Sequence, residues 1–253
     1  MDRRPHRTGE HRPVIVRVLA WVVSVVVLVV LGFLAWANTP MMGERPAALE
    51  VWRDSRVAVT DLGNAVELAP VDGRSGTGLV FIPGAIVDPY AYMYKLSEAV
   101  ADTGLTVLIT KPTLNLAFFD TRPLSAFTSH VPEVEHWYVG GHSLGGVRAC
   151  QLAADGDVSG LVLFGSYCAN DLSRTDLRVL SISGSRDGLS TPAKIDAARG
   201  LLPPDATMLQ IQGMNHAQFG DYGPQPGDGT ATISDAEARQ GVTVALGKFF
   251  GRG

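Results

Sequence analysis

The chain has 253 residues, of which 46% are hydrophobic and 18% charged, and its formal net charge at pH 7 is −4. This composition excludes an intrinsically disordered chain, which needs low hydrophobicity and high charge to remain unfolded. The mild acidity also argues against a polyanionic partner, so we expect no nucleic-acid binding.

The first predicted element is an uncharged hydrophobic run at residues 18–37. Twenty residues that rise about 1.5 Å each span the roughly 30 Å hydrocarbon core of a bilayer as a helix. Residues 1–17 are rich in arginine, and this positive charge keeps the N-terminus in the cytoplasm while the rest is exported. We therefore predict a single-pass protein of the cell membrane with its folded domain on the extracytoplasmic side.

The alternative is a secreted protein, because Ala35, Trp36 and Ala37 fit the small-x-small pattern of a signal-peptide cleavage site near Ala37. The run is longer than the usual 7 to 15 residues of a signal h-region, which favours the uncleaved anchor. In both cases the domain lies in an oxidising space, where Cys150 and Cys168 can form one disulfide. The sequence leaves this pairing open, since two small buried hydrophobic residues are the other interpretation.

Beyond the hydrophobic run, Pro40, Gly43 and Pro46 indicate a linker at 38–56, followed by the folded domain at 57–253. Short apolar strands alternate with helical stretches in this domain, which predicts right-handed βαβ crossovers. The expected fold class is α/β, with a mostly parallel eight-stranded sheet and helices on both faces. The expected strands are 57–60, 65–69, 78–82, 106–109, 136–139, 161–164, 179–182 and 208–211, and the expected helices are 90–101, 144–154, 192–201 and 234–250.

A serine at the end of the fifth expected strand is the candidate nucleophile. Residues 141–145, Gly-His-Ser-Leu-Gly, match the G-x-S-x-G pattern of a nucleophile elbow and lie between a strand and a helix, as the elbow requires. Ser143 has to adopt a tight, strained backbone there, and Gly141 and Gly145 lack the side chains that would crowd it. The alternative is a glycine-rich loop in which Ser143 caps a helix.

A serine hydroxyl is a weak nucleophile, so a base and an orienting acid are needed as well. Asp187 and His216 each lie just past a separate expected strand, and the order Ser143, Asp187, His216 is that of one known catalytic triad on a parallel sheet. We expect His216 to take the proton from Ser143 and Asp187 to orient the imidazole. Asp171, which follows the preceding strand, is the alternative acid.

The oxyanion formed during acyl transfer needs two convergent backbone N–H groups. Leu144, directly after the nucleophile, supplies one of them. The other is expected from Ala85 in the loop after the third strand, where Pro83 has no N–H and Gly84 permits close approach of the backbone.

Gly141 to Gly145, Asp187 and His216 on alternating strands resemble the α/β-hydrolase superfamily, over about residues 57–250. Residues 111–117, Lys-Pro-Thr-Leu-Asn-Leu-Ala, together with the N-terminal anchor are similar to a compact bacterial, esterase-like branch of it. Many members have His-Gly where this chain has Pro-Gly in the oxyanion loop. The superfamily's lid usually follows the strand after the elbow helix, and the short connection here predicts a lidless enzyme.

These features predict a serine hydrolase that cleaves carboxylic esters or thioesters through an acyl-enzyme, acting on a small acyl-ester or lipid-like substrate without cofactor or metal. The alternative is a non-catalytic, hydrolase-like binding module for a lipid or cell-envelope ligand, and acyl transfer to an alcohol would use the same residues. The loop at 220–229 either shapes the rim of the site or is a passive connection. Side chains that either line an acyl pocket or belong to the core are Tyr90, Tyr92, Tyr167, Met214 and Phe219.

Overall fold

The structure is a computed structural model that describes residues 14–251. The described chain forms two units that divide between Thr39 and Pro40. The expected basic N-terminal segment, residues 1–17, lies outside the described residues as far as residue 13.

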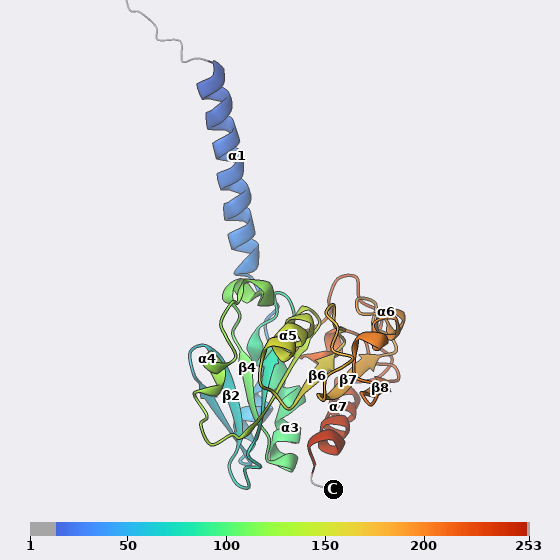
Figure 1. Cartoon of the computed structure of the whole chain (residues 1–253). Helices are drawn as coiled ribbons and strands as arrows, with labels where there is room; N and C mark the ends of the chain where they lie inside the picture. Colours follow the sequence, from blue (N-terminus) through green and yellow to red (C-terminus); the bar gives the residue numbers. More distant parts are fainter. Residues whose placement is uncertain (1–13, 252–253) are drawn as a thin grey trace, which may run out of the picture. The chain divides into compact units, whose positions relative to one another are not determined.

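The first unit consists of helix α1 (Val14–Ala37), labelled in Figure 1. Its 24 residues correspond to about 36 Å of helix, which is enough to cross a bilayer. Apolar side chains surround the helix on all sides, which is typical of a membrane span and also of a signal sequence. The helix begins four residues before the predicted hydrophobic run, since Val14 to Val16 extend the apolar pattern past Arg17.

The second unit is built on one eight-stranded sheet in the order β1-β2-β4-β3-β5-β6-β7-β8. The β1–β2 and β2–β4 pairs are antiparallel and every other neighbouring pair is parallel, which confirms the predicted mostly parallel α/β sheet. The strands are β1 (Val57–Asp61), β2 (Ala65–Pro70), β3 (Thr77–Ile82), β4 (Thr106–Thr110), β5 (His136–His142), β6 (Gly160–Phe164), β7 (Arg178–Gly184) and β8 (Thr207–Ile211).

Helices cover both faces of this sheet (Figure 1). Successive side chains of a strand point to opposite faces, and in β3 Leu79 and Phe81 enter one buried cluster with α3 and α7, whereas Ile82 enters another with α5. The central strands are therefore apolar on both sides. The helices of this unit are α2 (Arg45–Arg53), α3 (Met93–Thr103), α4 (Ser125–Thr128), α5 (Leu144–Asp155), α6 (Pro192–Ala197) and α7 (Asp235–Phe250).

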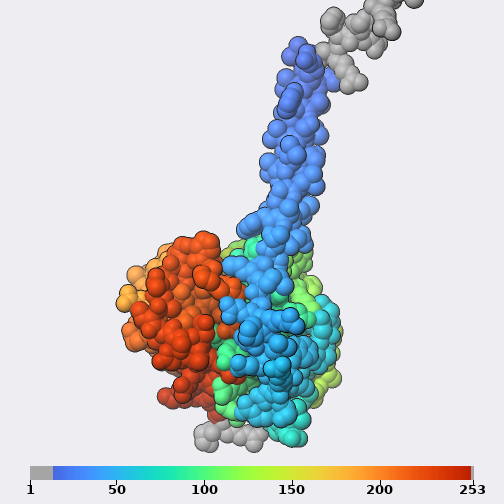
Figure 2. All heavy atoms as spheres, turned by 180° about the vertical axis from the view of Figure 1, so that it is seen from behind, coloured from blue at the N-terminus to red at the C-terminus, as the bar shows by residue number. Residues whose placement is uncertain are grey.

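Residues 40–56, which the sequence suggested as a linker, belong to the compact unit. Helix α2 buries Val51 in the core, and the backbone of Met41 pairs with that of Val87. The light-blue atoms of this part of the chain lie directly on the domain surface (Figure 2). The folded domain thus begins near Pro40 rather than at residue 57.

A disulfide joins Cys150, in α5, to Cys168, in the loop that follows β6. Of the two interpretations that the sequence left open, the structure therefore has the disulfide and not two separate buried thiols. Because α5 begins directly after Ser143, the bond ties the elbow helix to the neighbouring strand-end loop.

Candidate active site

Ser143 occupies a tight turn between β5 and α5. Its backbone has φ 52° and ψ −122°, a conformation that costs a side-chain-bearing residue free energy and that persists only where the surroundings enforce it. Two contacts with the end of β6 do so here: the Ser143 N–H donates to the carbonyl of Phe164 over 3.0 Å, and the Ser166 hydroxyl donates to the Ser143 carbonyl over 2.7 Å.

The two elbow glycines allow the start of α5 to press against the end of β3. A β-carbon added at Gly145 would lie 2.1 Å from the carbonyl oxygen of Ile82 and 2.3 Å from that of Pro83. One added at Gly141 would lie 2.5 Å from the carbonyl carbon of Gly145. No side chain fits at either position, so the nucleophile turn and the loop after β3 are in direct backbone contact.

This contact brings together the two segments expected to supply oxyanion donors. Gly84 is committed elsewhere, because its N–H donates to the Tyr92 hydroxyl over 2.9 Å. Within residues 14–251 the N–H groups of Ala85 and Leu144 make no hydrogen bond, and that of Leu144 lies in the first helical turn, where no intrahelical acceptor exists. Both predicted donors are therefore uncommitted within the described chain, as is the N–H of Gly145 in the same helical turn as Leu144.

His216 and Asp187 are joined by a hydrogen bond of 2.8 Å between Nδ1 and Oδ2, and both side chains are fully buried. The other carboxylate oxygen of Asp187 accepts the N–H groups of Leu189 and Ser190 over 2.9 and 2.7 Å. Asp187 thus has one oxygen held by its own loop and one left for the imidazole. This arrangement fixes the ring and directs a proton onto Nδ1.

The second imidazole nitrogen of His216, Nε2, is buried and makes no hydrogen bond to any described residue. The structure therefore brings Asp187 and His216 together but gives no hydrogen bond between His216 and the Ser143 hydroxyl. Such contacts in free enzymes are often long and tighten when a substrate binds.

Sequence reasoning missed a hydrogen-bonded chain beneath the oxyanion loop. The Tyr92 hydroxyl, which accepts the Gly84 N–H, is also hydrogen-bonded to Nδ1 of His142 over 2.9 Å. Burial and the nearby His216 lower the pKa of His142 well below its ordinary value, which keeps this ring neutral. Only the contact between residues 50 positions apart reveals the link.

The remaining predicted positions have ordinary roles. Asp171 is exposed and accepts the Ser173 N–H over 2.9 Å, as a turn-forming aspartate does. Tyr92, Met214 and Phe219 are completely buried members of the core. Tyr90 donates its hydroxyl proton to Asp61 over 2.8 Å.

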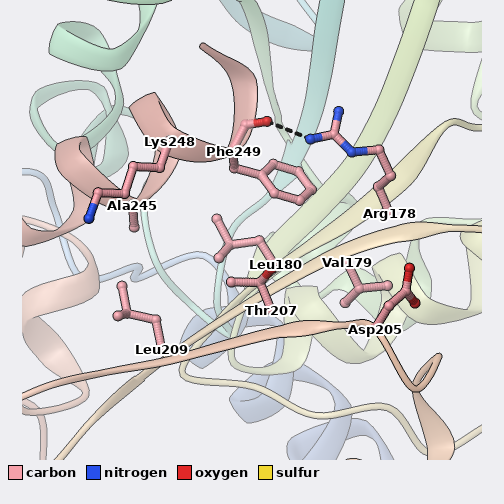
Figure 3. A pocket seen from close by; sticks show the side chains of 9 residues that line it. All are labelled: Arg178, Val179, Leu180, Asp205, Thr207, Leu209, Ala245, Lys248 and Phe249. Atoms are coloured by element: carbon pink, nitrogen blue, oxygen red, sulfur yellow. Dashed lines mark hydrogen bonds between the residues drawn. The ribbon is translucent and has the colours of Figure 1, made fainter. Parts of the chain in front are cut away.

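The described residues contain no group of three or more His, Cys, Asp or Glu side chains arranged to hold a metal ion. A cavity of about 290 Å³ lies at the amino ends of β7 and β8 under the end of α7 (Figure 3). Its lining includes Arg178, whose guanidinium donates to the Phe249 carbonyl over 2.9 Å, and none of the predicted site residues. The predicted chemistry belongs to the opposite, carboxyl ends of the strands.

Residues 78–240, from β3 into α7, match the sequence profile described as the Alpha/beta hydrolase family. The match covers more than half of the chain, and the protein belongs to this family. Membership supports a hydrolase activity. Among proteins of curated function, none matches the chain significantly.

Solved structures with the same fold include several esterases. The esterase domain of a Rhodothermus marinus protein has a TM-score of 0.54 and 15% identity over 74% of this chain and 94% of that one. An α/β serine hydrolase without a lid from Xanthomonas campestris has a TM-score of 0.53 and 12% identity over 79% and 97%. Carboxyl esterase 2 of Tuber melanosporum has a TM-score of 0.54 and 12% identity over 82% and 89%. At these identities the likeness establishes the fold.

Proposed function

We propose that the protein is a serine hydrolase of carboxylic esters or thioesters. The observation that carries the proposal is the buried His216–Asp187 pair, whose Nε2 has no partner among the described residues. A strained serine at the start of α5 and two uncommitted N–H groups accompany it. Related folds in solved esterases make an acyl substrate the natural choice.

In the proposed mechanism, Ser143 Oγ attacks the acyl carbonyl carbon while His216 Nε2 accepts the hydroxyl proton. The N–H groups of Leu144 and Ala85 donate to the oxyanion of the tetrahedral intermediate. His216 then gives its proton to the departing alkoxide or thiolate, which leaves an acyl ester on Ser143. A water molecule, deprotonated by His216, attacks that ester; the bond to Ser143 Oγ then breaks as His216 returns the proton to this oxygen, which releases the acid and restores the free serine. Asp187 stabilises the imidazolium formed in each half of the cycle.

Ser143→Ala tests the assignment. We expect kcat for p-nitrophenyl esters to fall at least about 10³-fold, because the covalent step is lost while binding and the oxyanion donors remain. A fluorophosphonate should modify the wild type and not this variant, whereas Ser129→Ala, which changes an exposed serine, should behave as the wild type. A wild type that is inert to both probes would instead support the binding-module alternative.

We also propose that α1 remains as a membrane anchor and that the domain faces the extracytoplasmic side. The Cys150–Cys168 disulfide supports an oxidising compartment. N-terminal sequencing of the membrane fraction should find residues before Ala37, and protease added to intact spheroplasts should digest the domain. A mature chain that starts near Asn38 would establish secretion instead.

A further inference from the structure

The loop between η5 (Ala217–Phe219) and α7 carries a carboxylate that serves several segments at once. Oδ1 of Asp228 accepts the N–H of Gly188 over 3.0 Å and the N–H of His216 over 3.1 Å. Oδ2 accepts the N–H of Ala217 over 2.8 Å. The fourth donor is the N–H of the following residue, Gly229, at 2.7 Å from Oδ1.

Three of these donors, the N–H groups of Gly188, His216 and Ala217, belong to the two loops that carry the proposed acid and base. Gly188 directly follows Asp187, and the second donor is the backbone of His216 itself. One carboxylate thus contacts the main chain next to both members of the hydrogen-bonded pair. Each of these N–H groups has no other acceptor among the described residues. A hydrogen bond to a charged acceptor is stronger than one to a neutral acceptor.

Close backbone packing supports the same connection. A β-carbon added at Gly229 would lie 1.9 Å from the carbonyl oxygen of Arg186, and one added at Gly188 would lie 2.6 Å from the Gly229 nitrogen. The Gly229 carbonyl also accepts the side-chain amide of Asn215, the residue before His216, over 2.9 Å. Gly229 therefore lies between the acid loop and the base loop without space for a side chain.

A simple turn does not account for this arrangement. A local turn would use only donors beside Asp228, such as the N–H of Gly229 or, in an Asx turn, the N–H two residues on. The other three donors lie 40, 12 and 11 residues away along the chain. We infer that Asp228 is a positioning residue that holds the Asp187 loop and the His216 loop in the register at which Nδ1 and Oδ2 meet. The inference rests on the proposed function for its catalytic consequence.

Asp228→Asn, measured in the full chain in detergent micelles, tests this role. The amide has nearly the same shape as the carboxylate, but its NH2 group cannot accept an N–H. We expect kcat for a p-nitrophenyl ester to fall about 10- to 100-fold with KM within about twofold, because small misplacements of catalytic groups have effects of that size. The low-field proton resonance of His216 Nδ1, which Asp187→Asn should abolish, should shift or disappear.

Asp171→Asn is the matched control, because it changes an exposed aspartate that also accepts a backbone N–H, and it should leave kcat and the resonance unchanged. If Asp228→Asn does not fold, Asp228→Glu keeps the charge, displaces it by one methylene group and should give the same two effects. The inference is overturned if kcat stays within about threefold, or if kcat falls while the resonance is unaltered. If the wild type neither hydrolyses esters nor reacts with a fluorophosphonate, the proposed function fails, and the resonance alone still tests the role of Asp228.

Discussion

The imidazole ring of His142 lies against that of His216, with ring centroids 4.4 Å apart. Both rings are buried. Because His216 becomes positively charged in the proposed cycle, a second charge on His142 would oppose it, and the lowered pKa of His142 prevents this. The same ring is hydrogen-bonded through Nδ1 to the Tyr92 hydroxyl.

The neutral state of His142 should appear in the pH dependence of stability. The pKa of His142 in the folded state lies below its value of about 6.5 in the unfolded chain. Below pH 6.5 the unfolded state therefore binds a proton that the folded state does not bind. The contribution of His142 to the free energy of unfolding is therefore lost as pH falls from 6.5. We expect the wild type to lose up to about 1.4 kcal/mol per pH unit more than His142→Asn in this range.

Urea unfolding of both proteins from pH 8 to pH 5 measures this difference. The asparagine amide oxygen can accept the Tyr92 proton and does not titrate, so the variant serves as the reference for all other groups. Parallel curves for the two proteins would contradict the prediction.

The backbone contact at the elbow makes Gly145 intolerant of substitution. In Gly145→Ala the new methyl group meets two carbonyl oxygens, of Ile82 and Pro83, so the turn must shift away from β3. We expect kcat to fall at least about tenfold and the free energy of unfolding to fall by about 1–3 kcal/mol. Gly247→Ala is the control: no atom lies within 4 Å of its added β-carbon, and alanine within α7 should stabilise the protein by about 0.5–1 kcal/mol. Similar losses in both variants would contradict this view.

A buried ion pair anchors the loop that follows η5. Lys95 Nζ lies 2.6 Å from Oδ1 of Asp221, and the two side chains are 0% and 4% exposed. Burial raises the pKa of Asp221 to about 6, against the lowering effect of Lys95. Lys95→Met leaves this carboxyl without its cation, and we expect a loss of about 3–5 kcal/mol in unfolding free energy at pH 8. Lys111→Met, which breaks the exposed pair with Asp61, should cost less than about 1 kcal/mol.

The sign of the pH effect distinguishes this mechanism from simple loss of packing. Without Lys95 the folded-state pKa of Asp221 rises further above its unfolded value, so stability is retained at low pH and lost as pH rises through the folded-state pKa. The deficit of Lys95→Met should therefore shrink between pH 8 and pH 4, and Asp221→Asn should rescue part of it at pH 8. A deficit that does not change with pH would contradict the prediction.

The disulfide should contribute measurably to stability. Cys150 and Cys168 are 18 residues apart, and a loop of that length corresponds to about 3 kcal/mol in the chain-entropy treatment of the unfolded state. We expect reduction by dithiothreitol to lower the unfolding free energy by about this amount. The Cys150→Ala/Cys168→Ala variant should already show the loss and should not respond to the reductant. Equal stability of the oxidised and fully reduced wild type would exclude a stabilising role.

Much of the sheet follows from local sequence because its central strands are apolar on both faces. The run at 106–109 predicts β4 within one residue, for example. Helix α2 was missed because Pro46 suggests a linker, although proline is tolerated in the first turn of a helix, where its absent N–H has no acceptor to lose. The helix predicted at residues 234–250 is α7, and in the structure Ser234 and Glu237 form a capping box at its start.

Within the candidate site, some residues could be predicted from the sequence and others could not. Ser143, Asp187 and His216 could be proposed because each follows a strand, and parallel strands end at one edge of the sheet. Their roles remain predictions for the experiments above. Tyr92 and Asp228 could not be proposed in this way, because their significance lies in hydrogen bonds across tens of residues that no local pattern encodes.

The connection between β6 and β7 runs only from Gly165 to Leu177, and the buried Leu172 and the disulfide at Cys168 hold it in place. A segment this short and this constrained cannot move as a lid over the carboxyl ends of the strands, where the candidate site lies. A catalytic cycle on this scaffold would proceed without a gating step at that position, and for the proposed ester hydrolysis this connection would act as a fixed wall. The rate of ester hydrolysis should accordingly show no jump when the substrate passes from monomers to micelles.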